Sequence, residues 1–292
     1  MPDLGSMRSV ETVGPRITVA AGRVAFAAAV LLLCSVGVFP FYWMFVTSIR
    51  PSTEIFEFPP RVLPSADSVF TPYLTLFEET GLAQWLWNSA AVSIATAFFA
   101  CLFGAMAAYA LSRFRFRGRE ASQVALLATQ MFPAILLALP MFIFFAQLGL
   151  LDSLFGLSLA YLAFLIPVAA VLLKAFFDAI PVELEEASLI DGASRIQTLF
   201  HITLRLSLPG LASTFLFCFI ISWDEFLFAR IFIRQPDNWT VSLGLASFSG
   251  EFVTPWDQVM AAATIITLPA AVIFLALQRY LVRGLTAGGI KG

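Results

Sequence analysis

Ionisable and metal-binding side chains are scarce in this 292-residue chain. Only 12% of its residues are charged, against about 25% in a typical soluble domain. A single histidine, His201, excludes a histidine-rich metal site. Cys34, Cys101 and Cys218 lie far apart within apolar runs, so neither a disulfide framework nor a zinc site is expected. The chain also lacks a Gly-x-x-x-x-Gly-Lys-Ser/Thr phosphate loop. We therefore expect no bound cofactor, no metal and no catalytic residues.

Apolar residues, by contrast, make up 60% of the chain, and phenylalanine alone occupies 31 positions. This is more apolar surface than water tolerates, and it is gathered into long runs, as a membrane protein requires. Six runs reach the roughly 20 residues that cross about 30 Å of hydrocarbon: 24–48, 86–112, 121–148, 155–177, 207–234 and 259–281. Lipid cannot satisfy exposed backbone groups, so each span must be helical. The predicted fold class is an all-α integral membrane protein with six transmembrane helices.

The basic residues predict how the chain is oriented. With the N-terminus inside, four of the 17 lysines and arginines fall on outer segments (Arg50, Arg61, Arg230 and Arg234), and the other thirteen fall on inner ones. Such a bias places both termini in the cytoplasm. The first apolar run is too long for a cleaved signal peptide. We predict a cytoplasmic N-terminal segment over 1–23 and a transmembrane domain over 24–292, in a multi-pass protein of the cytoplasmic (inner) membrane.

Small residues and prolines inside the runs predict local features of the helices. Ala100, Gly104 and Ala108 form a small-xxx-small pattern, which lets two helices approach closely. Prolines at 133, 140, 167 and 269 are expected to kink their spans.

One polar segment of about 30 residues, 178–209, separates two apolar runs on the predicted inner face. Pro181 suits a helix start, and the acidic residues that follow it suit the positive end of the helix dipole. Gly192 suits the end of that helix, and Ser194 can cap a second one. The segment is therefore expected to form two short helices that meet at a bend and contact another protein.

These residues resemble the EAA signature of permease subunits of ABC-type importers: Glu-Ala-Ala, three residues, Gly, nine residues, Ile, one residue, Leu-Pro. Glu186-Ala187-Ser188, Gly192, Ile202 and Leu204 stand at those spacings. Ser188 replaces the second Ala, and Arg205 replaces the Pro, which removes a backbone restraint and adds a charge. We call residues 178–209 the EAA loop.

The resemblance extends over most of the chain from residue 24. The segments 129–133 (TQMFP), 222–226 (SWDEF) and 284–292 (GLTAGGIKG) are similar to the carbohydrate-importing branch, and to its maltose-type second permease subunit. Asp224 stands where that branch often has Asn. The resemblance implies the type I ABC importer permease fold.

It also implies a division of labour among several subunits. The EAA loop would dock into a separate ATPase, which holds ATP and Mg and drives the helices between inward- and outward-facing states. The implied partners are a second permease in a heterodimer, two ATPase subunits, an extracytoplasmic sugar-binding protein, the sugar itself and membrane lipid; no nucleic acid is expected. The residues implied in coupling are Glu186, Ala187, Ser188, Asp191, Gly192, Ala193, Ile196, Leu199 and Phe200.

Polar residues inside spans are candidates for the substrate path, because charged groups at that depth normally face a polar cavity or a partner. Trp223 can stack on a sugar ring, and Asp224 can accept hydrogen bonds from its hydroxyls; Glu225, Gln130 and Asn88 complete the candidate set. Structural roles are open for the same residues: Asp224 can pair with Arg230, and Asn88 and Gln130 can join helices.

Two other functions remain open at this stage. A self-contained secondary transporter driven by an ion gradient would need charged relays inside the spans, which spans one to four largely lack. A membrane-embedded enzyme would need clustered nucleophiles, bases or metal ligands, and none is evident in the sequence.

Overall fold

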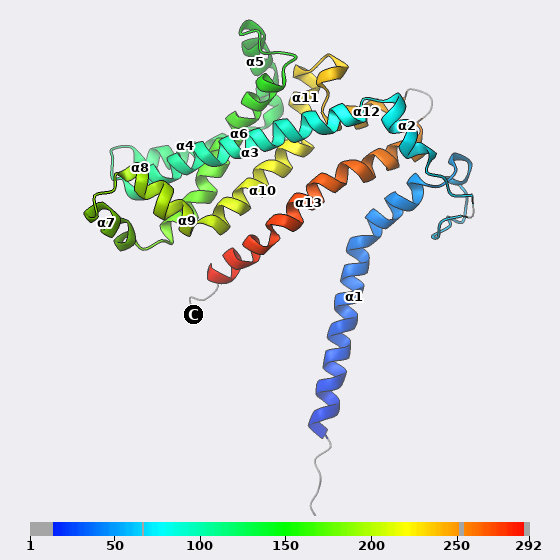
Figure 1. The fold of residues 1–292 in the computed structure, drawn as a ribbon, viewed down its shortest axis with the longest axis horizontal. Coiled ribbons are helices and arrows are strands. Elements are labelled where there is room, and N and C mark those ends of the chain that lie inside the picture. Colours follow the sequence, from blue (N-terminus) through cyan, green and yellow to red (C-terminus); the bar gives the residue numbers. More distant parts are fainter. Residues whose placement is uncertain (1–13, 66, 251–253, 289–292) are drawn as a thin grey trace, which may run out of the picture.

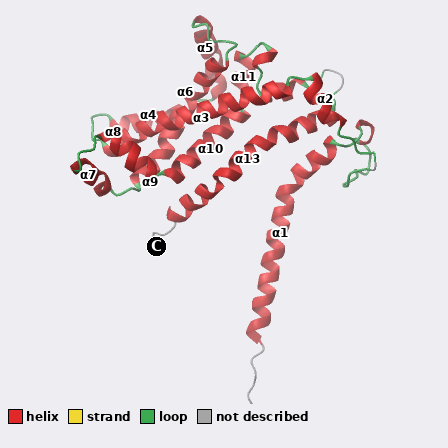
Figure 2. Ribbon diagram, viewed as in Figure 1, coloured by secondary structure: helices red, strands yellow, loops and turns green. Residues whose placement is uncertain are grey.

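The computed structural model describes residues 14–65, 67–250 and 254–288, and within these ranges the chain is helical and contains no strand (Figure 2). The long helices are α1 (Gly14–Ser48), α3 (Leu82–Arg113), α6 (Leu154–Asp178), α10 (Leu208–Asp224) and α13 (Trp256–Gly288). Shorter helices are α2 (Thr71–Glu79), α4 (Arg119–Thr129), α5 (Ala134–Gln147), α7 (Val182–Ile190), α8 (Arg195–Thr198), α9 (Leu204–Leu206), α11 (Leu227–Phe232) and α12 (Val241–Ser247). The 3₁₀ turns η1 (Ser52–Glu54) and η3 (Pro236–Asn238) and the π-helix η2 (Leu199–Thr203) complete the order. The all-helical fold class is confirmed.

Two sequence-based expectations fall partly outside these ranges. The first 13 residues of the predicted N-terminal segment and the last four residues of the tail motif are not among the described residues.

Within the described part of the chain, four stretches are long and apolar enough to cross a membrane: Gly22–Ser48, Leu82–Arg113, Leu154–Asp178 and Trp256–Tyr280. Two further pairs meet that condition only when joined: α4 with α5, bent by 96°, and Arg195–Leu206 with α10, bent by 84°. The number reaches six if each bent pair is one span. The six-span count therefore stays a prediction.

The expectation that spans three and five are single helices over 121–148 and 207–234 is wrong. The first breaks between α4 and α5, where Pro133 is extended (φ −60°, ψ 123°), because proline offers no N–H and restricts the residue before it. The second ends at Asp224, where Glu225 turns to an extended conformation (φ −67°, ψ 127°) before α11. Prolines 40, 140, 167 and 269, by contrast, lie inside continuous helices.

The centre of the fold is the contact of α3 with α6 and α10. A Cβ atom added at Gly104 would lie 2.6 Å from the Cβ of Ala169, so the two backbones approach as closely as the small-xxx-small pattern predicts. Ala100 and Ala108, one turn away on either side, are fully buried. This part of the sequence-based packing prediction is confirmed.

Several shorter elements lie at the two ends of this bundle. The short helices α7, α8 and α9 gather at one end, and α2 with the loop after α1 lies at the other (Figure 1). Helix α1 runs away from the bundle and meets α13 near its own C-terminal end. None of its most apolar window is buried within this chain.

Candidate functional site

The EAA loop folds as two short helical pieces joined by a tight turn. Helix α7 begins after Pro181 and ends at Ile190, two residues before Gly192, whose backbone takes a left-handed conformation (φ +89°). The N–H of Gly192 donates to Leu189 O (3.1 Å), and the N–H of Ala193 donates to Ser188 O (3.1 Å), a Schellman ending that glycine favours. Of the residues implied in coupling, Ser188 thus supplies a carbonyl to this ending, and its hydroxyl lies 3.1 Å from that of Thr198. The predicted bend at Gly192 is confirmed.

The second piece starts with a capping box at Ser194. The backbone N–H of Gln197 donates to Ser194 Oγ (3.3 Å), and the N–H of Ser194 donates to Gln197 Oε1 (2.7 Å). The piece continues as α8, η2 and α9 before the turn into α10. A π-helix in this position is unusual, and such segments often mark functional sites.

Two faces of the EAA loop differ sharply in exposure. The side chains of Glu186, Ile190 and Ile196 are exposed, with Ile190 at 87% and Ile196 at 69%. Asp191 and Ala187 are exposed beside them, and Ala193 is half-buried. Two exposed isoleucines and an exposed carboxylate on the same loop give it apolar and acidic surface, which is suited to contact a protein.

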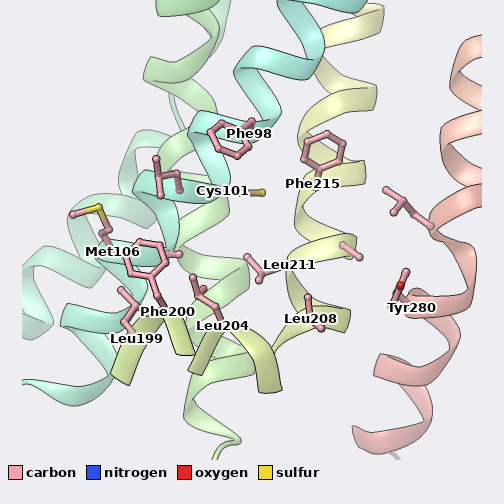
Figure 3. A pocket seen from close by; sticks show the side chains of 14 residues that line it. Phe98, Cys101, Met106, Leu199, Phe200, Leu204, Leu208, Leu211, Phe215 and Tyr280 are labelled. Atoms are coloured by element: carbon pink, nitrogen blue, oxygen red, sulfur yellow. The ribbon is translucent and has the colours of Figure 1, made fainter. Parts of the chain in front are cut away.

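Leu199, at 5% exposed, does not belong to this exposed surface, whereas Phe200 is 44% exposed and lies at its border. Leu199 is buried among residues of α3 and α6, including Ala105, Tyr109 and Phe177. Both Leu199 and Phe200 line an apolar cavity of about 460 Å³, together with residues of α3, α10 and α13 (Figure 3). They therefore attach the loop to the helices.

A buried ion pair makes the strongest polar attachment of the loop. The Nε of Arg113, at the end of α3, donates to Glu185 Oε1 (2.9 Å), and the two side chains are 6% and 1% exposed. One further nitrogen of Arg113 donates to the carbonyls of Phe177 (2.8 Å) and Ile180 (3.1 Å). Thr203, in η2, donates its hydroxyl to the same Glu185 oxygen (2.9 Å).

Sequence reasoning missed this ion pair. In the sequence, Glu185 is one of the acidic residues that follow Pro181, and Arg113 is one of the thirteen basic residues on the predicted inner segments. The two residues are 72 positions apart, so no local pattern connects them. The sequence holds one usable signal. Glu185 and Glu186 are adjacent, and adjacent residues on a helix point in different directions, so the two acids cannot face the same partner.

The five candidates for the substrate path lie in different environments. Trp223 is buried, and its ring stacks on Phe219 with 5.5 Å between ring centroids. Glu225 accepts hydrogen bonds from the N–H groups of Phe228 (2.9 Å) and Ala229 (3.1 Å), so it caps α11. Asp224, between them, is exposed and forms no ion pair with Arg230 in the described part of the chain.

Asn88 and Gln130 complete the candidate set. Asn88 is buried and donates to the carbonyls of Asp237 (2.8 Å) and Trp239 (2.9 Å). Gln130 is exposed at the α4–α5 break, where its amide approaches Phe164 O (3.4 Å). No hydrogen bond or ion pair joins any two of the five candidates within the described ranges. Asp224 and Gln130 therefore keep polar atoms available for a ligand.

The loop that Asn88 contacts is also fixed from the other side by Asp152. Its carboxylate accepts the backbone N–H groups of Arg234 and Gln235, both at 3.0 Å, and Asn238 donates to its carbonyl (2.8 Å). Partial burial tends to raise the pKa of the Asp152 carboxyl, but the N–H groups of Gln235 and Arg234 outweigh it and hold the pKa below its ordinary value. The hydrogen bonds of Asn88 and Asp152 thus hold residues 234–241 in place, and we call these residues the braced segment.

Comparison with known proteins gives this arrangement a family. Residues 100–287 match the family described as binding-protein-dependent transport system inner membrane component. The inner membrane ABC transporter permease protein YcjP of Escherichia coli is 35% identical, over 92% of this chain and 97% of that protein. The trehalose/maltose transport system permease protein MalG of Thermococcus litoralis is 36% identical, over 92% of this chain and 97% of that protein.

A solved structure shares the fold. A chain of a bacterial ABC transporter involved in the import of the acidic polysaccharide alginate superposes with a TM-score of 0.69, at 22% identity, and covers 96% of this chain and all of the other. The resemblance drawn from residues 186–204 is confirmed. The chain is a multi-pass inner membrane protein that belongs to the binding-protein-dependent transport system inner membrane component family, the permeases of ABC importers.

Proposed function

We propose that this chain is one of two transmembrane permease subunits of an ATP-driven importer, which passes a sugar delivered by an extracytoplasmic binding protein. The permease domain spans residues 24–292, crosses the membrane six times and keeps both termini, with the segment 1–23, in the cytoplasm. Relatives whose names include trehalose and maltose transport support a sugar substrate. The thirteen inner and four outer basic residues support the orientation.

The observation that carries the proposal is the divided EAA loop. Its exposed face presents Glu186, Ile190 and Ile196, while its buried face is attached to α3 and α6 through Leu199 and Glu185. We infer that a separate ATPase, which holds ATP and Mg, binds the exposed face of the EAA loop. Leu199 and Phe200 then pass the movement to the helices around the apolar cavity, and Gly192, with its neighbours Ala187, Ser188, Asp191 and Ala193, keeps the turn in shape.

The magnitudes show which contacts matter for such coupling. Moving a two-state transporter from 1:99 to 99:1 requires about 5.5 kcal/mol of differential binding. An exposed ion pair at Glu186 contributes about 0–1 kcal/mol. Ile190 and Ile196 contribute about 1.5–3 kcal/mol each when fully buried. Together these contacts give about 3–7 kcal/mol, so one loop reaches the required value only in the upper half of the range, and we expect the loop of the second permease to contribute as well.

For the substrate path we propose that Asp224 and Gln130 face the sugar directly. Trp223 and Glu225 would hold the α10–α11 break that presents Asp224, and Asn88 would hold the braced segment beside it. An exposed carboxylate at the end of α10 accepts hydrogen bonds from sugar hydroxyls without first breaking an ion pair.

Co-purification with the products of neighbouring genes tests this function. The complex should contain a second permease and an ATPase, and its ATPase rate should rise when a binding protein loaded from a carbohydrate panel is added. Glu186→Ala with Ile190→Ala should weaken ATPase retention, and Glu183→Gln, an exposed acid on the same helix, is the matched control. If the chain binds no ATPase, or if no binding protein stimulates the complex, the proposal is wrong.

A further inference from the structure

One buried ion pair joins the EAA loop to α3 and to the end of α6. Arg113 belongs to α3, and its guanidinium contacts the carbonyls of Phe177 in α6 and Ile180 just after it. Its Nε holds Glu185 of α7, and Glu185 in turn accepts from Thr203 in η2. α3, the end of α6, α7 and the π-helix therefore meet at a single buried ion pair.

Stability alone is a poor explanation for this arrangement. Replacing a buried ion pair by apolar residues of similar volume is often neutral or stabilising, because the charges no longer have to leave water. Glu185 Oε2 also has no hydrogen-bond partner within the described residues, although it is buried.

The geometry of the bonds suggests what the charges add. Arg113 uses a rigid planar fork, and its bonds to Glu185, Phe177 and Ile180 point in different directions. Apolar contacts such as those of Leu199 resist separation but permit sliding, because dispersion and the hydrophobic effect are not directional. Directional bonds to three segments fix their register as well as their distance.

We propose that Arg113 is a positioning residue for transport: through Glu185 it makes α3, the end of α6 and the EAA loop move as one rigid body when the ATPase closes. This inference rests on the proposed function, because it assumes that the loop is driven by an ATPase. Without the pair, the ATPase would still grip Ile190 and Ile196, but the loop would shift against α3.

The test compares three variants in the assembled complex. The double substitution Arg113→Met with Glu185→Met removes both charges and keeps much of the volume, so folding is preserved. Arg113→Lys keeps the charge opposite Glu185 but loses the fork that reaches both carbonyls. Lys174→Gln is the matched control, since it removes the ion pair with Asp178 (2.6 Å), which lies on α6 near the same end of the bundle.

Two readouts separate positioning from a structural role. The first is the stimulation of the ATPase rate by a binding protein loaded with maltose or trehalose. The second is the distance distribution between spin labels at Phe103 in α3 and Glu183 in α7, both exposed, with MgATP as the only ligand. The labelled protein carries Cys34→Ser, Cys101→Ala and Cys218→Ala.

In the wild-type complex and in Lys174→Gln, we expect one narrow distance that MgATP leaves unchanged. In the double variant the distribution should broaden or shift with MgATP, while ATPase retention stays normal. Its stimulation should fall at least about fivefold, the lower end of ordinary coupling between sites, and Arg113→Lys should fall in between. Wild-type stimulation and an unchanged distance in the double variant would overturn the inference.

The outcome also distinguishes this inference from the proposed function. If the wild-type complex is not stimulated by any loaded binding protein, both are overturned. If the wild-type complex is stimulated and the Arg113 variants behave like it, only the positioning role is lost. If the double variant does not assemble, Arg113→Lys decides by the same two readouts.

Discussion

Gly192→Ala offers a sharp test of the coupling role, because the chain contains its own control. Gly192 (φ +89°) and Gly118 (φ +90°) take nearly the same left-handed conformation, and a Cβ added at either would meet nothing within 4 Å. The cost of alanine at both sites is therefore backbone strain alone, about 1–2 kcal/mol. Gly118 precedes α4, whereas Gly192 forms the turn of the EAA loop.

Although the backbone strain is equal at the two sites, only the substitution at Gly192 should affect the binding of the ATPase. A cost of about 1–2 kcal/mol corresponds to a factor of about 5–30 in an equilibrium. If the ATPase binds the native turn at Gly192, Gly192→Ala should lower the affinity for the ATPase by that factor, and Gly118→Ala should leave it unchanged. Gly192→Pro should uncouple ATP use from uptake while the protein remains in the membrane, because proline fixes φ near −65°.

The assay measures ATPase binding to the purified permease pair, together with ATP hydrolysis and uptake in vesicles. The thermal midpoints of the two alanine variants should be similar, which confirms equal strain. Equal losses of ATPase affinity in both variants would refute the reasoning, and so would a Gly192→Pro complex that transports normally.

Three further predictions concern residues outside the EAA loop. Gly244→Ala should lower thermal stability by about 1–3 kcal/mol through overpacking, because the new Cβ would lie 2.0 Å from the ring of Trp85; a thermal scan of the purified complex checks this. Asp152, whose carboxyl pKa is lowered in the folded protein, should stabilise the fold above its unfolded pKa, and this contribution should be lost as the pH falls through the lower folded pKa; Asp152→Asn should remove that part of the acid dependence. Asp224→Asn should change the apparent affinity for sugar in uptake assays, and an unchanged affinity would remove Asp224 from the path; Trp223→Ala should mainly lower stability by about 3–5 kcal/mol, as expected for a buried tryptophan, and an unchanged thermal midpoint would contradict that role.

The sequence predicted those features that depend on neighbouring residues or on composition. The helical fold follows from the long apolar runs, and the close helix approach at Gly104 and the turn at Gly192 each follow from a short local pattern, although the pattern at Gly104 does not name α6 as the partner. The cap at Ser194 was predicted as well, but the reciprocal bond from Ser194 N–H to Gln197 that completes a capping box was not. The EAA spacing was specific enough to identify the family before any fold was known.

The features that were missed depend on contacts between distant residues. The Arg113–Glu185 pair joins positions 72 residues apart, and helical periodicity alone gave Leu199 and Ile196 the same role although one is buried and the other is exposed. The break at Pro133 was expected only as a kink, because the sequence does not show that α5 leaves α4 at 96° and packs near α11. Tertiary packing decides each of these cases.

Uptake into vesicles tests the central claim most directly. Vesicles that contain this chain with its second permease, ATPase and loaded binding protein should accumulate radiolabelled sugar only when ATP is present on the ATPase side. Vesicles that contain the chain without the ATPase should accumulate nothing, with or without an ion gradient. Accumulation against a gradient by this chain alone would contradict the account, because it would show that no separate ATPase drives the EAA loop.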